Sequence, residues 1–112
     1  MIKIRQMQVD DIPVVLTINQ SYQQRPLSRE ELMKFNDLQE GICIVAEEDT
    51  KVVGFLLLLL SQTAASILDV ETDTEHVGSP ITGYLLEAAR KIAIENGITA
   101  FYKTRAFHTP VF

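Results

Sequence analysis

The spacing of apolar and polar residues predicts a strand and then a helix at the start of the chain. Over residues 2–6, isoleucines alternate with lysine and arginine. A period of two residues is typical of a strand with one buried face. Residues 10–23 then place apolar side chains at helical spacing, behind two aspartates and beside Pro13. Acidic residues and proline favour the first turn of a helix, so this segment is predicted to be helical.

A second helix and three strands are predicted in the middle of the chain. Ser28 and Glu31 have the spacing of a capping box, which predicts a helix over residues 28–39. Apolar runs then predict strands at residues 42–46, 52–62 and 65–71, with a turn at 47–51. Because leucine is a weak strand former, a helix over 52–62 is the alternative, but Gly54 and the two adjacent valines favour a strand.

The clearest helix begins after Ser79-Pro80 and ends at Asn96-Gly97, because proline suits the first helical turn and glycine the end. Residues 98–107 contain alternating and aromatic residues and are predicted to return to the sheet as a last strand. The expected element order is therefore β-α-α-β-β-β-α-β. With no internal repeat or linker, residues 1–112 are expected to form a single α/β (α+β) domain.

Charge and composition exclude several classes of function. The chain of 112 residues has a formal net charge of -5, so a general nucleic-acid-binding surface is not expected. The longest apolar run is far shorter than the roughly 20 residues of a membrane-spanning helix, and no signal-peptide core is visible. Cys43 is the only cysteine, which excludes an internal disulfide and any multi-cysteine metal site. These features favour a cytoplasmic protein with no metal.

The segment from Ile67 to Lys91 carries a resemblance to a known family. A strand there leads into a loop with Gly78, then a helix with the paired leucines 85–86 and a following Asn96-Gly97. Together with the element order, this resembles the GNAT superfamily of N-acetyltransferases, whose members bind acetyl-coenzyme A. The resemblance covers nearly the whole chain. It implies a mixed, mostly antiparallel central sheet flanked by helices, shortened at the C-terminal end.

The resemblance also implies where acetyl-CoA would bind. The pantetheine arm is expected along the strand and the pyrophosphate at the loop, which gives the candidate cofactor residues Val70, Thr72, Gly78, Ser79, Ile81, Thr82 and Gly83. Backbone N–H groups at a helix start suit a pyrophosphate. However, Val77, Pro80 and Thr82 depart from the Arg/Gln-x-x-Gly-x-Gly/Ala pattern of the family, which weakens the expected site. The alternative interpretation is that Ser79 caps the helix and Pro80 occupies its first turn, with no ligand.

Two carboxylates in the preceding strand are the candidate catalytic groups. Asp69 and Glu71 lie two residues apart, so both face the same side of the strand. Either could remove a proton from a substrate ammonium before the amine attacks a thioester, although ordinary solvated carboxylates are the alternative. His76 and His108 are weaker candidates for a base or a phosphate contact. The family usually supplies a tyrosine as the acid for the leaving thiolate, but no residue of this chain matches its position. Tyr84 and Tyr102 do not match it either, and both are expected to pack.

The predicted function is acetyl-CoA-dependent N-acetylation of a small amine or peptide amine. The alternative is a catalytically inactive GNAT-like module for binding, regulation or assembly, which the altered loop would suit. A sheet that ends with the fifth strand exposes an edge, so a homodimer is expected. The residues predicted at such a contact are Phe101, Phe107, Val111 and Phe112.

Overall fold

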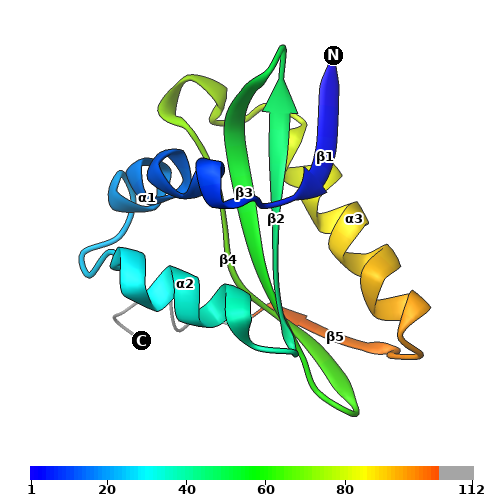
Figure 1. Cartoon of the computed structure of the whole chain (residues 1–112). Coiled ribbons are helices and arrows are strands. Elements are labelled where there is room, and N and C mark those ends of the chain that lie inside the picture. Colours follow the sequence, from blue (N-terminus) through cyan, green and yellow to red (C-terminus); the bar gives the residue numbers. More distant parts are fainter. Residues whose placement is uncertain (104–112) are drawn as a thin grey trace.

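Five strands form one sheet in the order of the sequence (Figure 1). The computed structural model describes residues 1–103. The strands are β1 (Ile2–Gln6), β2 (Gly41–Glu48), β3 (Lys51–Leu60), β4 (Ala64–Thr72) and β5 (Ala100–Lys103). Neighbouring strands from β1 to β4 are antiparallel, whereas β5 runs parallel to β4. The expected mixed and mostly antiparallel sheet is confirmed.

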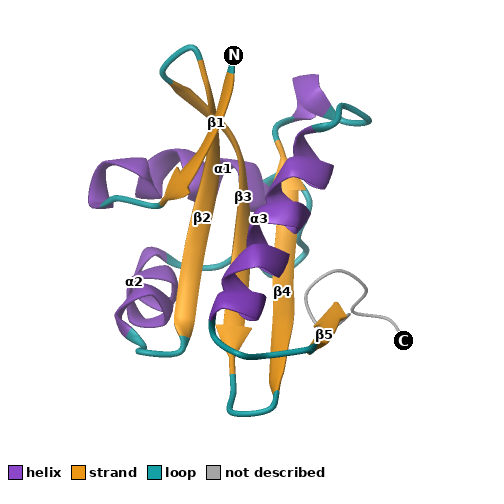
Figure 2. Cartoon of the chain, turned by 90° about the vertical axis from the view of Figure 1, so that its right-hand side faces the viewer, coloured by secondary structure: helices purple, strands orange, loops and turns teal. Residues whose placement is uncertain are grey.

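Helices cover both faces of this sheet. The helices α1 (Ile12–Gln20) and α2 (Arg29–Asp37) lie on one face, and α3 (Ile81–Glu95) lies on the other (Figures 1 and 2). Two short 3-10 helices, η1 (Val9–Asp11) and η2 (Thr74–His76), precede α1 and α3. This order matches the predicted β-α-α-β-β-β-α-β arrangement. No helix in residues 1–103 has both the length and the apolar character needed to span a bilayer.

Several local predictions are confirmed and others need correction. The capping box forms, with the Ser28 N–H donating to Glu31 at 2.9 Å and the Glu31 N–H donating to the Ser28 hydroxyl at 3.1 Å. Residues 51–60 form a strand rather than the alternative helix. The first helix is shorter than predicted, because its start is the 3-10 helix η1. The predicted last strand is described only as far as Lys103, and residues 104–112 lie outside the described part of the chain.

Each face of the sheet buries its own hydrophobic core. On the α3 side, Leu56, Leu58 and Ile67 pack against Leu85 and other apolar residues of the helix. On the opposite side, Val15 of α1 and Leu32 of α2 share a core with residues of the sheet. These include Cys43, Phe55 and Leu57. Burial of apolar surface on both faces of the central strands accounts for the leucine-rich, uninterrupted apolar sequence of β3.

Gly54 lets α3 approach the sheet closely. A Cβ atom at this position would lie 3.1 Å from the Glu71 carbonyl oxygen and 3.3 Å from side-chain carbons of Ile81 and Leu85. These distances are shorter than ordinary van der Waals contact. The glycine that favoured a strand in the sequence therefore also fixes how α3 packs at the end of β3 beside β4.

A β-bulge in β4 decides which side chains face α1. Leu57 of β3 pairs with Asp69, whereas the next residue, Leu58, pairs with Ile67, so Leu68 is an extra residue in β4. A bulge of this kind re-aims the side chains that follow it. Ile67 and Val70 join the core under α3, whereas Leu68 packs with the core under α1 and α2. Asp69 consequently faces α1 as well.

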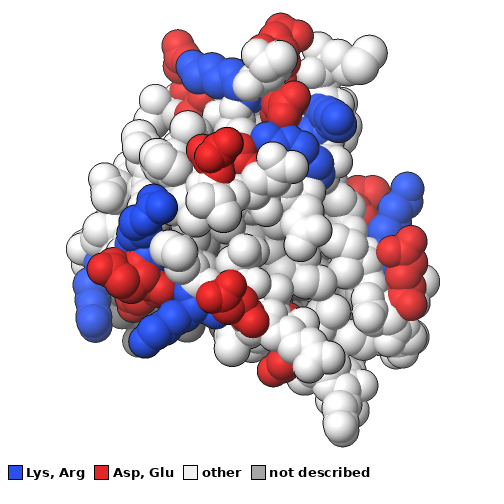
Figure 3. All heavy atoms as spheres, viewed as in Figure 1, with Lys and Arg blue, Asp and Glu red and all other residues white. Residues whose placement is uncertain are grey.

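Acidic and basic side chains are interspersed on the face of the molecule shown in Figure 3, so neither charge dominates this face.

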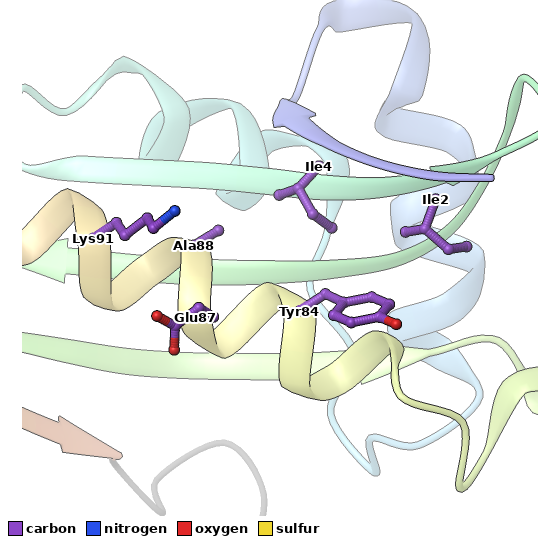
Figure 4. Close-up of a pocket in the computed structure, with 6 residues that line it drawn as sticks. All are labelled: Ile2, Ile4, Tyr84, Glu87, Ala88 and Lys91. Atoms are coloured by element: carbon purple, nitrogen blue, oxygen red, sulfur yellow. The ribbon is translucent and has the colours of Figure 1, made fainter.

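A shallow hollow lies between β1 and α3, lined by Ile2, Ile4, Tyr84, Glu87, Ala88 and Lys91 (Figure 4). Tyr84 contributes to this hollow with about half of its surface exposed, and Tyr102 is also exposed. The two tyrosines, which were expected to pack, therefore keep about half or more of their surface exposed.

Candidate active site

The bulge in β4 places the two predicted carboxyl groups, which lie two residues apart in the strand, on the α1 side of the sheet. Asp69 has no solvent-exposed surface, whereas Glu71 is partly exposed. The two side chains lie close enough for each to affect the pKa of the other. Two neighbouring carboxyl groups disfavour a second negative charge, because like charges repel more strongly away from water.

Burial sets the proton affinity of this pair. Burial raises the pKa of Asp69 to about 8, and the charge of Glu71 adds to the effect. Burial also raises the pKa of Glu71, but the hydrogen bonds from Asp69 and Gln23 and the charge of Lys103 oppose this rise. The hydrogen bond between the two side chains raises the pKa of Asp69 and lowers that of Glu71. Burial therefore favours retention of a proton by the pair, and Asp69 is the more deeply buried of the two carboxyl groups.

Residues at the end of α1 and just after it also surround the pair. The Asn19 Nδ2 group donates to Asp69 Oδ2 at 3.0 Å, and the Gln23 Nε2 group donates to Glu71 Oε2 at 3.4 Å. The pKa of Tyr22 is raised by burial and by the charge of Glu71, which places its phenol close to the pair. The sequence analysis missed these three residues. Asn19 does carry a signal, because it is a polar residue on the helix face that otherwise buries apolar side chains.

Val70 and Thr72, the predicted pantetheine contacts, have buried side chains. The Asp73 N–H donates to the Val53 carbonyl across the sheet at 2.9 Å. Because successive residues of a strand direct their N–H groups to opposite edges, those of Val70 and Thr72 point away from β3. Within residues 1–103, β5 pairs only with the first part of β4, from Ala64 to Ile67. The N–H groups of Val70 and Thr72 thus point to the β5 edge of β4, at a part of β4 that β5 does not pair with in the described residues.

The predicted phosphate loop is exposed and partly engaged by its own hydrogen bonds. Gly78 has a φ of 82°, and Gly78 and Gly83 both have open space where a Cβ atom would lie. The Ser79 N–H donates to the His76 carbonyl at 3.0 Å, and the Ile81 N–H lies 3.4 Å from the Ser79 hydroxyl oxygen. The N–H groups of Ser79 and Ile81, two of the candidate cofactor residues, thus already have acceptors within the chain. The N–H groups of Thr82 and Gly83 lie in the first turn of α3, where no preceding turn supplies carbonyl partners.

Pro80, rather than Ser79, is the N-cap of α3. The sequence analysis placed Ser79 at the cap and Pro80 one residue further into the helix, so that prediction is wrong by one residue. Pro80 has no N–H, and the helix therefore begins without a backbone donor at its cap. Only the helix start and Gly78 keep the character of an anion-binding loop.

His76 is held by two carboxylates at the end of the sheet. Its Nδ1 lies 2.5 Å from Asp73 and its Nε2 lies 2.9 Å from Glu48. These hydrogen bonds raise the pKa of His76, which favours the charged imidazolium. With both nitrogens engaged, His76 is a structural link between η2 and the end of β2. The other histidine candidate, His108, and the predicted dimer residues Phe107, Val111 and Phe112 lie outside the described residues, whereas Phe101 packs partly into the core under α3.

The sequence profile of the Acetyltransferase (GNAT) family matches the chain over residues 11–110. The chain belongs to the GNAT acetyltransferase family. This match covers the carboxyl pair, the loop and the helix that follows it. Among curated protein sequences, none matches the chain significantly.

Solved structures share the GNAT fold at low sequence identity. The ribosomal-protein-S18-alanine N-acetyltransferase from Escherichia coli superposes with a TM-score of 0.81 and 16% identity, covering 92% of this chain and 66% of its own. Ard1 from Thermoplasma volcanium gives a TM-score of 0.79 and 21% identity over 87% of this chain and 66% of its own. An aminoglycoside acetyltransferase from an uncultured soil metagenomic sample gives 0.76 and 20% over 92% and 76%. This GNAT chain thus spans about two thirds of the length of the first two structures.

Proposed function

We propose that this GNAT chain is an acetyl-CoA-dependent N-acetyltransferase whose acceptor is the amine of a small molecule or a peptide. The observation that carries the proposal is the pair of carboxyl groups on β4, the buried Asp69, which Asn19 of α1 contacts, and the partly exposed Glu71. An amine acceptor is an ammonium ion at neutral pH and must lose a proton before it can attack. A carboxylate with a raised pKa is suited to take that proton.

The loop and strand fit the cofactor in part. The open space at Gly78 and Gly83 would admit a pyrophosphate, and the N–H groups of Thr82 and Gly83 would donate to it. The backbone of Val70 and Thr72 would lie along the pantetheine arm. Pro80 supplies no N–H, so the phosphate contacts are fewer than in a loop with glycine there. When bound, acetyl-CoA supplies the acetyl group as a thioester.

In the proposed mechanism, Glu71 is the base and Asp69 is its partner. The Glu71 carboxylate accepts the proton of the acceptor ammonium, directly or through one water, and the amine lone pair is then free to react. In this proposal the buried Asp69, whose pKa burial raises to about 8, keeps its proton. Two acceptors named among the structural neighbours, a protein alanine and an aminoglycoside, both present an amine, which agrees with an amine-class substrate.

Calorimetric titration with acetyl-CoA and with coenzyme A tests the cofactor part of the proposal. Saturable binding in the micromolar range would support it. Absence of heat up to millimolar ligand would contradict it and would favour the alternative, a GNAT module that has lost its cofactor. The altered loop at Pro80 and Thr82 is the specific observation behind that alternative.

Replacing the base tests the catalytic part. We expect Glu71→Gln to lower kcat/KM for acetyl transfer about 100-fold or more, because general base catalysis contributes about 10² to 10⁴. A panel of primary amines and peptides with free N-termini would be assayed by release of free thiol from acetyl-CoA. Glu87→Gln, which changes a carboxylate of α3 at the hollow beside β1, is the matched control and should leave the rate unchanged. Equal rates for Glu71→Gln and the native protein would exclude Glu71 as the base.

A further inference from the structure

His76 lies at the centre of the connection between β4 and α3. Its backbone N–H donates to the Asp73 carbonyl at 3.1 Å, and its carbonyl accepts from the Ser79 N–H at 3.0 Å. Its ring Nδ1 lies 2.5 Å from Asp73 Oδ1, and its ring Nε2 lies 2.9 Å from Glu48 Oε1. Asp73 and Ser79 belong to the same connection, whereas Glu48 is the last residue of β2. The contact with Glu48 is therefore the one of these four that joins the connection to β2.

Both ring nitrogens of His76 face carboxylate oxygens, and this fixes the charge of the ring. An ionised carboxylate only accepts hydrogen bonds, so each nitrogen that contacts one must carry a hydrogen. A neutral imidazole has a single N–H, whereas the imidazolium has two. The two contacts are therefore both hydrogen bonds only when His76 is charged. These hydrogen bonds in turn raise the pKa of His76.

A neutral ring would keep its contact with Asp73 and lose the one with Glu48. Asp73 is the N-cap of η2, and its own N–H donates to the Val53 carbonyl of β3, so its position does not depend on the ring. The Glu48 side chain is 40% exposed, so water can solvate its carboxylate once the contact is broken. Loss of the proton thus frees the connection from β2 and leaves η2 in place.

We propose that the His76 imidazolium is a positioning residue, which holds the loop at residues 77–80 against the end of β2 and thereby aligns the start of α3 for the phosphates of coenzyme A. This inference rests on the proposed function, in which that loop receives the pyrophosphate. Asp73 and Glu48 are the charged groups that act on His76. Lys51 of β3 lies opposite Glu48 in the sheet, and Glu75 is an acidic residue of η2; neither is altered in the experiments below.

Nitrogen-15 NMR of the His76 ring and of backbone amides at the start of α3 tests this role in the protein without ligand. The His76 titration should lie above about pH 6.5, the ordinary pKa of histidine. The Ile81 and Thr82 amide resonances should shift together with this titration, because the loop before them is released when the ring becomes neutral. Constant Ile81 and Thr82 resonances through the His76 titration would overturn the proposal.

Glu48→Gln is the decisive variant. Its amide can accept from a protonated ring nitrogen or donate to an unprotonated one, so the link to β2 no longer needs the charge of His76. The amides at the start of α3 should then no longer follow the His76 titration. Glu40→Gln removes an exposed carboxylate beside the opposite end of β2 and is the matched control, which should behave as the native protein does. Amides that follow the titration equally in Glu48→Gln and the native protein would contradict the proposal.

Calorimetry with coenzyme A at pH values on either side of the His76 titration tests the effect on binding. We expect the native protein to bind at least about fivefold more tightly on the acidic side, the low end of coupling between two sites. By linkage, bound coenzyme A should move the His76 titration to higher pH by the same factor. In Glu48→Gln the affinity should change much less with pH. An equal change in both proteins would mean that His76 attracts the phosphates only by its charge, which contradicts a positioning role.

These readouts separate the role of His76 from the proposed function. The NMR titrations need no ligand, so a native protein in which the start of α3 follows His76 but coenzyme A does not bind would contradict only the proposed function. A protein that binds coenzyme A while the start of α3 is indifferent to His76 would contradict only the positioning role. If Glu48→Gln does not fold, the titration of the native protein alone decides.

Discussion

Asp69 makes the stability of the fold depend on pH. Burial raises the pKa of this carboxyl to about 8, whereas an aspartate in the unfolded chain has a pKa of about 4. Between these values the folded chain binds a proton that the unfolded chain has released. By linkage, the stabilisation is complete below the unfolded pKa, decreases as the pH rises, and is lost above the folded pKa. Each unit of pKa difference corresponds to about 1.4 kcal/mol.

Asp69→Asn should remove this pH dependence. An amide has the shape of a protonated carboxyl group and can still donate to Glu71, but it does not ionise. We expect the free energy of unfolding of the native protein to fall between about pH 4 and pH 8. That of the variant should fall less, so we expect the variant to be more stable than the native protein by about 1 to 3 kcal/mol at pH 9. Urea unfolding at a series of pH values measures both. Asp37→Asn, at an exposed site on α2, is the control; parallel curves for the native protein and Asp69→Asn would show that Asp69 is not buried as a neutral acid.

At the scale of elements, the start of α3 combines features that favour and oppose anion binding. The helix dipole and the N–H groups of its first turn favour a phosphate. Pro80 at the N-cap removes one donor, and the Ser79 N–H is already bonded to the His76 carbonyl. The connection from η2 into α3 thus satisfies part of its own hydrogen-bonding capacity, which leaves fewer groups for coenzyme A.

Pro80→Gly should restore a donor at this position. A hydrogen bond to a charged phosphate contributes about 1.5 to 3 kcal/mol, so we expect coenzyme A to bind about tenfold more tightly, with a small loss of helix stability. Calorimetry on the native protein and the variant gives the two dissociation constants. Pro13→Gly removes a proline from the first turn of α1 instead and should leave the affinity unchanged. If coenzyme A binds and Pro80→Gly has the affinity of the native protein, the pyrophosphate does not lie at this loop.

At the scale of the whole molecule, the sequence predicts what short-range patterns determine. The periods of two and 3.6 residues yielded the element order, and the spacing of Ser28 and Glu31 yielded the capping box. The bulge at Leu68 was not predictable, because no glycine or turn residue marks it, and it depends on pairing with β3. The contact of Asn19 with Asp69 joins segments far apart in the chain, and only the assembled sheet and helices bring them together.

Sequence alone also identified Asp69 and Glu71 as neighbours on one side of a strand, since two residues is the strand period. It could not give the burial of Asp69, which raises the pKa of that carboxyl group. That burial arises from α1, which covers this part of β4 and presents Asn19 among apolar side chains. The proximity of the two carboxyl groups was therefore predictable from local spacing, whereas their burial is a property of the packed molecule.

The packing of the whole molecule also predicts the reactivity of Cys43. This thiol lies on β2 with no exposed surface, and its sulfur is 3.4 Å from that of Met7 in the core under α1 and α2. Burial raises its pKa to about 12, so the folded chain presents neither access nor a thiolate. Because β2 is paired with β1 and β3 and its two faces border separate cores, exposing this thiol requires the sheet to open.

We therefore expect Cys43 to react with an aromatic disulfide reagent at least about 10³-fold more slowly in the folded protein than in urea, as global opening of a domain with ordinary stability implies. The variant Gln62→Cys adds an exposed thiol in the turn between β3 and β4 and serves as an internal control. Its labelling should show one fast and one slow thiol, with the slow rate increasing in proportion to the unfolded fraction as urea is added. Two thiols of equal rate in the absence of urea would show that β2 opens locally, without unfolding of the two cores.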